Sequence, residues 1–532
     1  MSLDTPPKDI GNRVVIIGAG IAGLAAAARL AHAGRDVIVL ERHDAPGGKM
    51  RCLPSEAGPV DTGPTVLTYR HVFDALFSEL GEKIEDHVNL IPQHLIARHF
   101  WPDGSQLDLF DDEALNARAI EDFAGAKAAQ QFQSFSNRAR QLFDGFDQPM
   151  MQDACPSLPG LVKHVAARPA LIRQMAPLST LDALLKRSFD DPRLVQLFGR
   201  YATYVGGSPY QSPALLSLIW QVESEGVWVV RGGMHRLAQA IANLASARGA
   251  EFRYNTHVDQ IETADGRVTG LRLSDGTPIA AQTVLFNGDP RALATGAMGP
   301  DCTGIAPQTS RIQRSLSAEV WAFAARVTGP ELAHHNVFFR DDPKSEFDSL
   351  EKGKMADDPT LYICAMDRGL PETPPEVERF EIIANAPPLT MTPGPKGKEE
   401  LSQCQNRTFQ TLTRFGLQFD PIPGGLSLTT PTRFEALFPA TAGSLYGQSP
   451  HGMMAAFQRP TARTQIKGLY LAGGGTHPGA GVPMATLSAQ HAAEAILSDQ
   501  TSTLMSRPTA MRGGISTGSA TTAGAPSASS GS

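Results

Sequence analysis

Residues 13–41 read RVVIIGAGIAGLAAAARLAHAGRDVIVLE, and this stretch carries the clearest indication of the fold. An apolar strand leads into Gly18-x-Gly20-x-x-Gly23, an alanine-rich helix follows, and a second apolar strand comes after the helix. Glycines at this spacing allow a tight turn, a close approach of backbone to a pyrophosphate, and close packing of the helix on the strand. The stretch therefore predicts a Rossmann-type unit that binds a dinucleotide.

Other residues of this stretch are expected to contact the two halves of the nucleotide. Ile21 and Ala22 open the helix, and the free N–H groups and positive dipole at a helix start favour phosphate. Glu41 ends the second strand, 23 residues after Gly18, where a carboxylate can accept hydrogen bonds from the adenosine ribose. Arg42 follows directly. We expect all four residues to contact the cofactor.

The composition excludes several classes of protein. The chain has 532 residues, of which 42% are apolar, and this is enough for a large core. The formal charge of −7 provides no basic surface for a nucleic acid. Five cysteines are scattered without the spacing of a zinc site, so we expect reduced thiols in a cytosolic protein and no bound metal. They are Cys52, Cys155, Cys302, Cys364 and Cys404.

We expect neither a signal peptide nor a membrane-spanning segment. The apolar run that begins after residue 13 is accounted for by the nucleotide turn, and the first ten residues carry two aspartates against one lysine. No stretch reaches the roughly 18 apolar residues that a spanning helix needs. Small polar residues and glycine dominate residues 499–532, which we expect to form a disordered tail.

Nucleotide-binding features fall into three separated blocks, residues 11–85, 226–290 and 465–498. The second block carries Asp265-Gly266 and Asp275-Gly276, both of which are signals of β-hairpins. The intervening residues 86–225 and 291–464 are long helical and mixed segments without such features. We expect a discontinuous α/β cofactor domain with an inserted α+β substrate domain. The chain has no second GxGxxG, so we expect no NAD(P)H domain.

Two segments that follow Glu41 point to a flavin. The first is Ala-Pro-Gly-Gly48-Lys49-Met50, and the second is Gly63-Pro64-Thr65. A Gly-Gly-basic element at this place resembles the flavin amine oxidases and the carotenoid desaturases, in which its backbone N–H groups reach the diphosphate and the ribityl chain. An ordinary Pro-Gly-Gly turn is the alternative. The resemblance implies that the cofactor is FAD and that these residues from Gly48 onward contact it.

The C-terminal block contains another glycine-rich turn, LYLAGGGTHPGAGVPM at 469–484. In the resembled families this strand, turn and helix pass beneath the flavin ring. This implies cofactor contacts from Gly473, Gly474, Val482, Pro483 and Met484. Many flavoproteins have an aspartate where Gly474 stands, so a contact with the ribityl chain must come from backbone here. His477 can act in catalysis or simply hydrogen-bond the loop, and we favour the loop.

Two residues of the second block complete the expected cofactor site. Val258 lies in THVDQI, which resembles the strand whose backbone pairs with adenine, although a plain core valine is equally consistent. Asn287 opens the segment NGDP, and we assign it to cofactor binding as well.

Five segments follow one another in the order found in bacterial carotenoid desaturases of the phytoene-desaturase family. They are GPTVL (63–67), VGGSP (205–209), GVW with GGM (226–234), NGDP (287–290) and THPG (476–479). The resemblance covers nearly the whole chain. The sequences of residues 58–77 and 200–228 are most similar to those of 1-hydroxycarotenoid 3,4-desaturases. It implies an enzyme with non-covalent FAD that introduces a C-3,4 double bond into an acyclic carotenoid of the 1-hydroxyneurosporene or 1-hydroxylycopene type. It also implies oxygen or a quinone as the electron acceptor.

Three other functions remain open. A phytoene or neurosporene desaturase would differ in tunnel length and end-group contacts, which these motifs do not report. A carotenoid isomerase would use reduced FAD and leave the product mass unchanged. A non-catalytic lipid carrier of the same fold, of the Rab-escort type, would not need the Gly47-Gly48-Lys49 element.

Residues 159–189 form a basic and apolar segment in an otherwise acidic chain. Asp182 is their only acid, whereas the basic residues are Lys163, Arg168, Arg173, Lys186 and Arg187. The pattern resembles a helical pair that docks on a bilayer, from which a C40 carotenoid enters; a solvated helical hairpin is the alternative. We expect a cytoplasmic protein attached peripherally to the inner membrane. Lys163 and His164 are candidates for the catalytic proton acceptor, although a plain surface position is the better interpretation of each.

Overall fold

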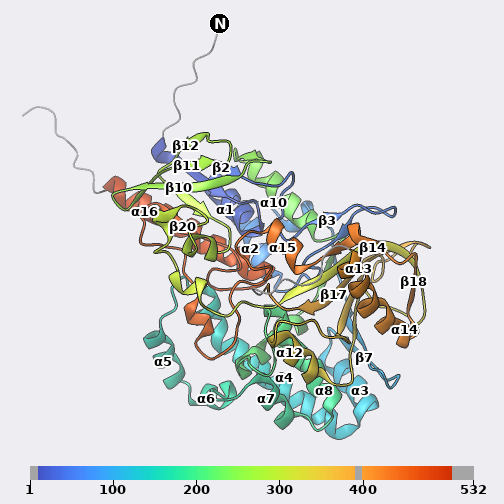
Figure 1. Cartoon of the computed structure of the whole chain (residues 1–532). Coiled ribbons are helices and arrows are strands. Elements are labelled where there is room, and N and C mark those ends of the chain that lie inside the picture. Colours follow the sequence, from blue (N-terminus) through green and yellow to red (C-terminus); the bar gives the residue numbers. More distant parts are fainter. Residues whose placement is uncertain (1–9, 390–397, 506–532) are drawn as a thin grey trace, which may run out of the picture.

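The cofactor part of the molecule is built on a five-stranded parallel sheet in the order β20-β13-β1-β2-β9. A computed structural model describes residues 10–389 and 398–505 of the chain (Figure 1). The five strands come from distant parts of the sequence: β1 (Arg13–Ile17), β2 (Asp36–Leu40), β9 (Glu251–Arg253), β13 (Val284–Phe286) and β20 (Leu469–Leu471). The α/β Rossmann-type fold predicted from the sequence is confirmed.

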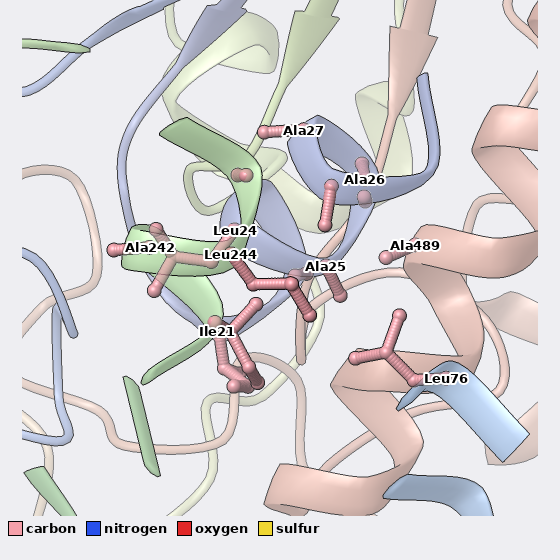
Figure 2. Close-up of a cluster of buried hydrophobic side chains, with 14 of the residues drawn as sticks. Ile21, Leu24, Ala25, Ala26, Ala27, Leu76, Ala242, Leu244 and Ala489 are labelled. Atoms are coloured by element: carbon pink, nitrogen blue, oxygen red, sulfur yellow. The ribbon is translucent and has the colours of Figure 1, made fainter. Parts of the chain in front are cut away.

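Helix α1 (Ile21–His32) is the centre of the core beside this sheet. It packs against α10 (His235–Ala247) and α16 (Val482–Met505). Figure 2 shows why the helix is rich in alanine: Ala25 and Ala26 face the helix that carries Ala489, and only small side chains leave room for such close neighbours. Leu76 of α2 (His71–Glu79) closes the cluster.

Both hairpins predicted from Asp-Gly pairs are confirmed. Strands β10 (Val258–Ala264), β11 (Arg267–Leu273) and β12 (Pro278–Ala280) form an antiparallel sheet. The first turn has φ of 51° at Asp265 and 70° at Gly266. Positive φ at both central residues is the geometry that makes Asp-Gly a favoured hairpin turn. This small sheet places Val258 beside the cofactor part.

A second, eight-stranded sheet runs in the order β18-β14-β17-β16-β15-β6-β7, and β19 pairs with β14. Its pairs are antiparallel except for β15 with β6. The strands are β6 (Leu95–Phe100), β7 (Gln106–Phe110), β14 (Ser317–Thr328), β15 (His335–Phe338), β16 (Leu361–Ala365), β17 (Glu378–Ala386), β18 (Gln418–Asp420) and β19 (Leu428–Thr429). There are also two short antiparallel pairs. One joins β3 (Cys52–Leu53) to β4 (Val60–Asp61), and the other joins β5 (Leu90–Pro92) to β8 (Trp228–Val230).

Most of the remaining helices lie beyond this sheet, at the lower side of Figure 1. A cluster of aromatic side chains, with Phe132, Phe198 and Trp220 fully buried, holds several of them together. The helices are α3 (Glu113–Ala124), α4 (Ala126–Phe146), α5 (Leu158–Ala166), α6 (Pro169–Met175), α7 (Leu181–Ser188), α8 (Pro192–Gly199), α9 (Ile219–Ser224) and α12 (Pro343–Glu351). Of these, α5 and α6 lie at the edge of the molecule (Figure 1).

The C-terminal helix is longer than expected. Helix α16 continues to Met505, into the stretch from 499 that we expected to be disordered. Asp499 explains part of this extension, because it pairs with Arg463 at 3.0 Å and accepts a hydrogen bond from the Tyr470 hydroxyl at 2.9 Å. The rest of the expected tail, 506–532, lies outside the described residues. None of the described helices combines the length and the apolar character needed to cross a membrane.

Candidate functional site

One cavity of about 1500 Å³ extends from the turn after β1 into the helical part of the molecule. All but one of the predicted cofactor residues line it. They are Gly18, Gly20, Ile21, Ala22, Glu41, Arg42, Gly48, Lys49, Met50, Gly63, Pro64, Thr65, Val258, Asn287, Gly473, Gly474, Val482, Pro483 and Met484. Residues from three distant blocks of sequence therefore share one wall, which supports our proposal that they bind one cofactor.

The exception is Gly23, whose role is packing. A Cβ on Gly23 would lie 2.1 Å from the carbonyl oxygen of Gly18, so any larger residue would collide with the turn. Gly18 itself has a φ of 98°, and its N–H donates to Leu40 at 2.8 Å. Because α1 begins at Ile21, directly after this turn, the start of the helix faces the cavity.

Glu41 is buried and bonded to the same turn. One carboxylate oxygen accepts the Ala19 N–H at 2.6 Å, and the other accepts the His43 N–H at 2.9 Å. Each oxygen still has a lone pair for a further donor, such as a ribose hydroxyl. The contact with the ribose was predicted from the sequence, whereas the hydrogen bond to the turn was not.

Asn287 connects two glycine turns. Its side-chain amide donates to the carbonyl oxygens of Gly18 at 3.0 Å and Gly20 at 3.3 Å. Its own amide oxygen lies 3.0 Å from the point where a Cβ on Gly473 would be. Asn287 was predicted to contact the cofactor, and the structure adds that it positions the phosphate turn.

The turn at Gly48 lies against the first turn, Gly63 lies against the turn at Gly48, and the space beside them suits a dinucleotide. A Cβ on Gly48 would lie 3.1 Å from the Cα of Gly20, and one on Gly63 would lie 1.9 Å from the Lys49 carbonyl oxygen. Side chains there would fill the cradle that backbone N–H groups need in order to approach phosphates. These residues fit FAD.

Lys49 and Arg459 are two of the cationic residues that line the same cavity. The Lys49 ammonium donates to the Leu445 carbonyl, and burial lowers the pKa of Lys49 to about 8. Arg459 donates to the carbonyl of Gly474 at 2.7 Å, and burial lowers its pKa to about 10. Arg459 was not predicted, because nothing in the sequence around it distinguishes it from a surface arginine. Both cations favour an anionic cofactor.

His477 stabilises its loop through a hydrogen bond. Its Nε2 lies 2.8 Å from the Asp153 carbonyl oxygen, and burial lowers the pKa of the imidazole to about 4. The ring is therefore neutral at physiological pH and stacks on His491, with 5.9 Å between the centroids. This geometry agrees with the loop role that the sequence favoured.

The two candidate proton acceptors lie apart from the cavity. Neither Lys163 nor His164 lines it. Both belong to α5, where Lys163 is exposed and the His164 Nε2 lies 2.8 Å from the Gly145 carbonyl oxygen. The cavity wall instead carries Arg200, Tyr204 and Tyr362. These three residues were not predicted. Tyr362 contacts Thr65 and His335 from distant segments, whereas Arg200 and Tyr204 are near neighbours that belong to no recognised catalytic motif.

Away from the glycine turns the cavity wall is mainly apolar. Its side chains come from the helices and from the second sheet: Phe146, Met150, Met151, Phe189, Val195, Leu215, Leu216, Ile219, Val222, Val337, Phe339 and Phe347. The volume exceeds the roughly 300–1,000 Å³ of common ligand pockets. The cavity has room for a long apolar molecule beside the cofactor.

The fold and this site define an FAD-dependent oxidoreductase. The model of the flavin containing amine oxidoreductase family matches residues 21–497. The hydroxyneurosporene desaturase of Cereibacter sphaeroides is 52% identical over 92% of this chain and 99% of its own length. That of Rhodobacter capsulatus is 50% identical over 92% and 98%. The chain therefore belongs to the flavin containing amine oxidoreductases and, among them, to the carotenoid desaturases.

A solved structure agrees on the fold. A triple mutant of putrescine oxidase superposes with a TM-score of 0.59 over 92% of this chain and 99% of its own, at 14% identity. At this identity the likeness shows the fold alone.

Proposed function

We propose that the chain introduces the C-3,4 double bond into an acyclic 1-hydroxycarotenoid and passes the electrons to oxygen or a quinone. The observation that carries this proposal is the single cavity that joins the glycine turns to a long apolar wall. The relatives named hydroxyneurosporene desaturase support a hydroxylated acyclic carotenoid as substrate.

The chain contributes binding, orientation and exclusion of water. Bound FAD would supply the redox chemistry, accepting a hydride from one of the two carbons of the new double bond. The glycine turns and Glu41 would hold the nucleotide half, while the apolar wall keeps a polyene aligned with the reacting centre. Alignment of this kind contributes much of the acceleration in such a reaction. The proton from the neighbouring carbon must leave to a group on the cavity wall or to water.

We further propose that α5 and α6 dock on a bilayer. Leu158, Val162 and Ile172 are exposed on these helices, and Leu178 just after them is fully exposed. An isolated exposed apolar residue is ordinary, whereas a group of them beside basic residues is typical of an interfacial helix.

Other side chains of α5 and α6 connect these helices to the cavity. Leu161, Val165 and Leu171 belong to one apolar cluster with Met150 and Met151, and these two methionines line the cavity. A carotenoid leaving the bilayer here would reach the cavity wall directly.

The docking region that we propose is smaller than the segment predicted from the sequence. The segment 159–189 forms three helices, and the third, α7, buries Leu181, Leu184 and Leu185. Lys186 of α7 pairs with Asp182 at 2.9 Å. We therefore restrict the proposed docking surface to residues 158–178.

Product analysis tests the proposed reaction. The purified FAD-loaded enzyme is given 1-hydroxyneurosporene, neurosporene and phytoene in liposomes, with oxygen or a quinone as acceptor. We expect the first substrate to lose two hydrogens and gain one conjugated double bond, seen by mass and absorbance. A product of unchanged mass would indicate an isomerase, and preferential conversion of phytoene would assign the chain to the phytoene desaturases. Protein freed of FAD is the control.

A further inference from the structure

The position of the reacting bond fixes where the substrate hydroxyl must lie, so this inference rests on the proposed function. Three single bonds of about 1.5 Å each join the 1-hydroxyl oxygen to C3. The oxygen therefore stays within about 4.5 Å of a carbon that must face the cofactor. Its hydrogen-bond partner has to adjoin the cofactor loops, not the far end of the apolar wall.

A chain of three polar side chains meets this condition. Thr65 belongs to the segment 63–65 that we propose contacts the cofactor, and its Oγ1 lies 2.7 Å from the Tyr362 hydroxyl. The same hydroxyl lies 2.7 Å from the Nδ1 of His335. Thr65 and Tyr362 line the cavity, whereas His335 is buried behind them. Among the described residues, the Nε2 of His335 has no hydrogen-bond partner.

The chain retains hydrogen-bonding capacity at its cavity end. Burial holds the pKa of His335 well below its ordinary value, so the ring is neutral and carries one proton. If Nδ1 accepts from Tyr362, Thr65 can donate to Tyr362 and keeps an oxygen lone pair free. If Nδ1 donates, Tyr362 donates to Thr65, which keeps a free hydroxyl proton. An alcohol both donates and accepts, and therefore completes the chain in either state.

Several other polar groups on the wall are already engaged. Lys49 donates to the Leu445 carbonyl and Arg459 to that of Gly474. Asp182 is paired with Lys186, and the Tyr204 hydroxyl donates to Glu223 at 3.2 Å. These contacts use donors or acceptors that a substrate hydroxyl would otherwise need.

The surroundings of Tyr362 suit the rest of the end group. Val337 and Phe339 line the cavity, and Val337 is opposite Tyr362 in the register of β15 and β16. The carbon that carries a 1-hydroxyl also carries two methyl groups. A polar spot beside apolar side chains matches this combination.

We propose that the Thr65–Tyr362 hydroxyl pair, positioned by His335, binds the 1-hydroxyl of the carotenoid through Thr65 and thereby places its C3–C4 bond at the cofactor. An end group without the hydroxyl leaves the buried hydroxyl pair without its partner, and a site of this kind rejects such an analogue. Thr65 and Tyr362 are therefore specificity-determining residues.

Tyr362→Phe tests the proposal with two substrates, a 1-hydroxycarotenoid and its 1,2-dihydro analogue that lacks only the hydroxyl. The ratio of their kcat/KM values is measured together with flavin content. We expect the wild type to prefer the alcohol and Tyr362→Phe to lower the ratio about tenfold or more. Thr65→Val is the second variant, for use if Tyr362→Phe folds poorly, and it should also lower the ratio. Tyr446→Phe removes another tyrosine hydroxyl from a cavity-lining residue and should leave the ratio unchanged.

Each other outcome overturns the proposal. An unchanged ratio in Tyr362→Phe with normal flavin content would remove Tyr362 from the hydroxyl site, and a lower ratio in Tyr446→Phe alone would assign that site to Tyr446. A wild type that converts both substrates equally well would contradict this inference while the proposed desaturation stands. A wild type that converts neither would contradict the proposed function itself.

Discussion

The Glu41 carboxylate accepts the Ala19 N–H at 2.6 Å, so the acid that ends β2 holds the turn that follows β1. The register of the two strands brings this about, because Ile17 pairs with Leu40 and both chains leave the sheet at the same edge. The residue expected to bind the ribose thus also fixes the phosphate turn, and its two roles should fail together.

Glu41→Ala should raise the Kd for FAD by roughly tenfold to a hundredfold, because a buried charge-assisted hydrogen bond and a ribose partner are lost together. Glu41→Gln keeps one acceptor and should have a smaller effect. Flavin fluorescence quenching measures the Kd. Asp36→Ala is the matched control, since Asp36 lies at the other end of β2 and pairs with Arg13. Equal affinity in Glu41→Ala and the wild type would contradict both roles.

Gly23→Ala should abolish tight FAD binding and destabilise the fold by about 1–3 kcal/mol, because the added Cβ would lie 2.1 Å from the Gly18 carbonyl oxygen. The clash involves backbone on both sides and cannot be relieved by a rotamer change. Flavin content and the thermal midpoint of the apoprotein measure the two effects. Gly304→Ala, at an exposed site with open space around the new Cβ, should change neither. A stable, yellow Gly23→Ala protein would show that the turn can shift.

The features predicted correctly from the sequence are those that a local conformation requires. Asp265-Gly266 forms a hairpin turn because aspartate and glycine tolerate the positive φ values that the turn requires. The Gly18 turn was predicted from the spacing of its glycines. Contacts that join distant segments have no local sequence pattern from which they could be predicted. The amide of Asn287 reaches a turn 269 residues away, and the Arg459 guanidinium donates to carbonyl oxygens of two separate segments, at Tyr446 with Gln448 and at Gly474. The Thr65–Tyr362 pair is of the same kind.

His164→Ala should keep its turnover, because His164 does not line the cavity and its Nε2 is engaged with the Gly145 carbonyl. We expect only a loss of about 1 kcal/mol in stability from the missing hydrogen bond. Turnover with saturating carotenoid, corrected for flavin content, measures this. A large drop in turnover at normal flavin content would restore His164 as the proton acceptor that the sequence suggested.

Reversing the charges of Lys163, Arg168 and Arg173 to Glu should weaken binding to anionic vesicles by at least about tenfold, since each basic residue near such a surface contributes about 1 kcal/mol. Co-sedimentation with phosphatidylglycerol vesicles measures the binding. Val162→Asp with Leu178→Asp should weaken it at high salt as well, because these side chains would enter the lipid. Lys352→Glu with Lys354→Glu, two exposed sites outside α5 and α6, is the control. Unchanged sedimentation of the first variant would remove the docking surface from 158–178.

Asp61 should make the stability of the wild type fall as the pH rises from about 4 to about 6. Burial raises the pKa of this carboxyl from 3.8 to about 6, despite the N–H bonds it accepts from Met234 at 2.6 Å and from His235. Between these two values the folded state keeps a proton that the unfolded chain has lost, so the stabilisation is complete below pH 3.8 and lost through pH 6. A difference of about two pKa units corresponds to roughly 3 kcal/mol.

Asp61→Asn removes this titration and keeps an acceptor for the Met234 N–H. The free energy of unfolding of the wild type minus that of Asp61→Asn, from urea midpoints, should therefore decrease between pH 4 and pH 6 and stay constant above. Asp275→Asn is the matched control with the opposite sign, because a backbone N–H donated by Thr277 lowers the pKa of the exposed Asp275 carboxyl. A difference that does not change with pH would mean that Asp61 has the same pKa in both states, and a difference that rises with pH would mean that the folded protein stabilises its charged form.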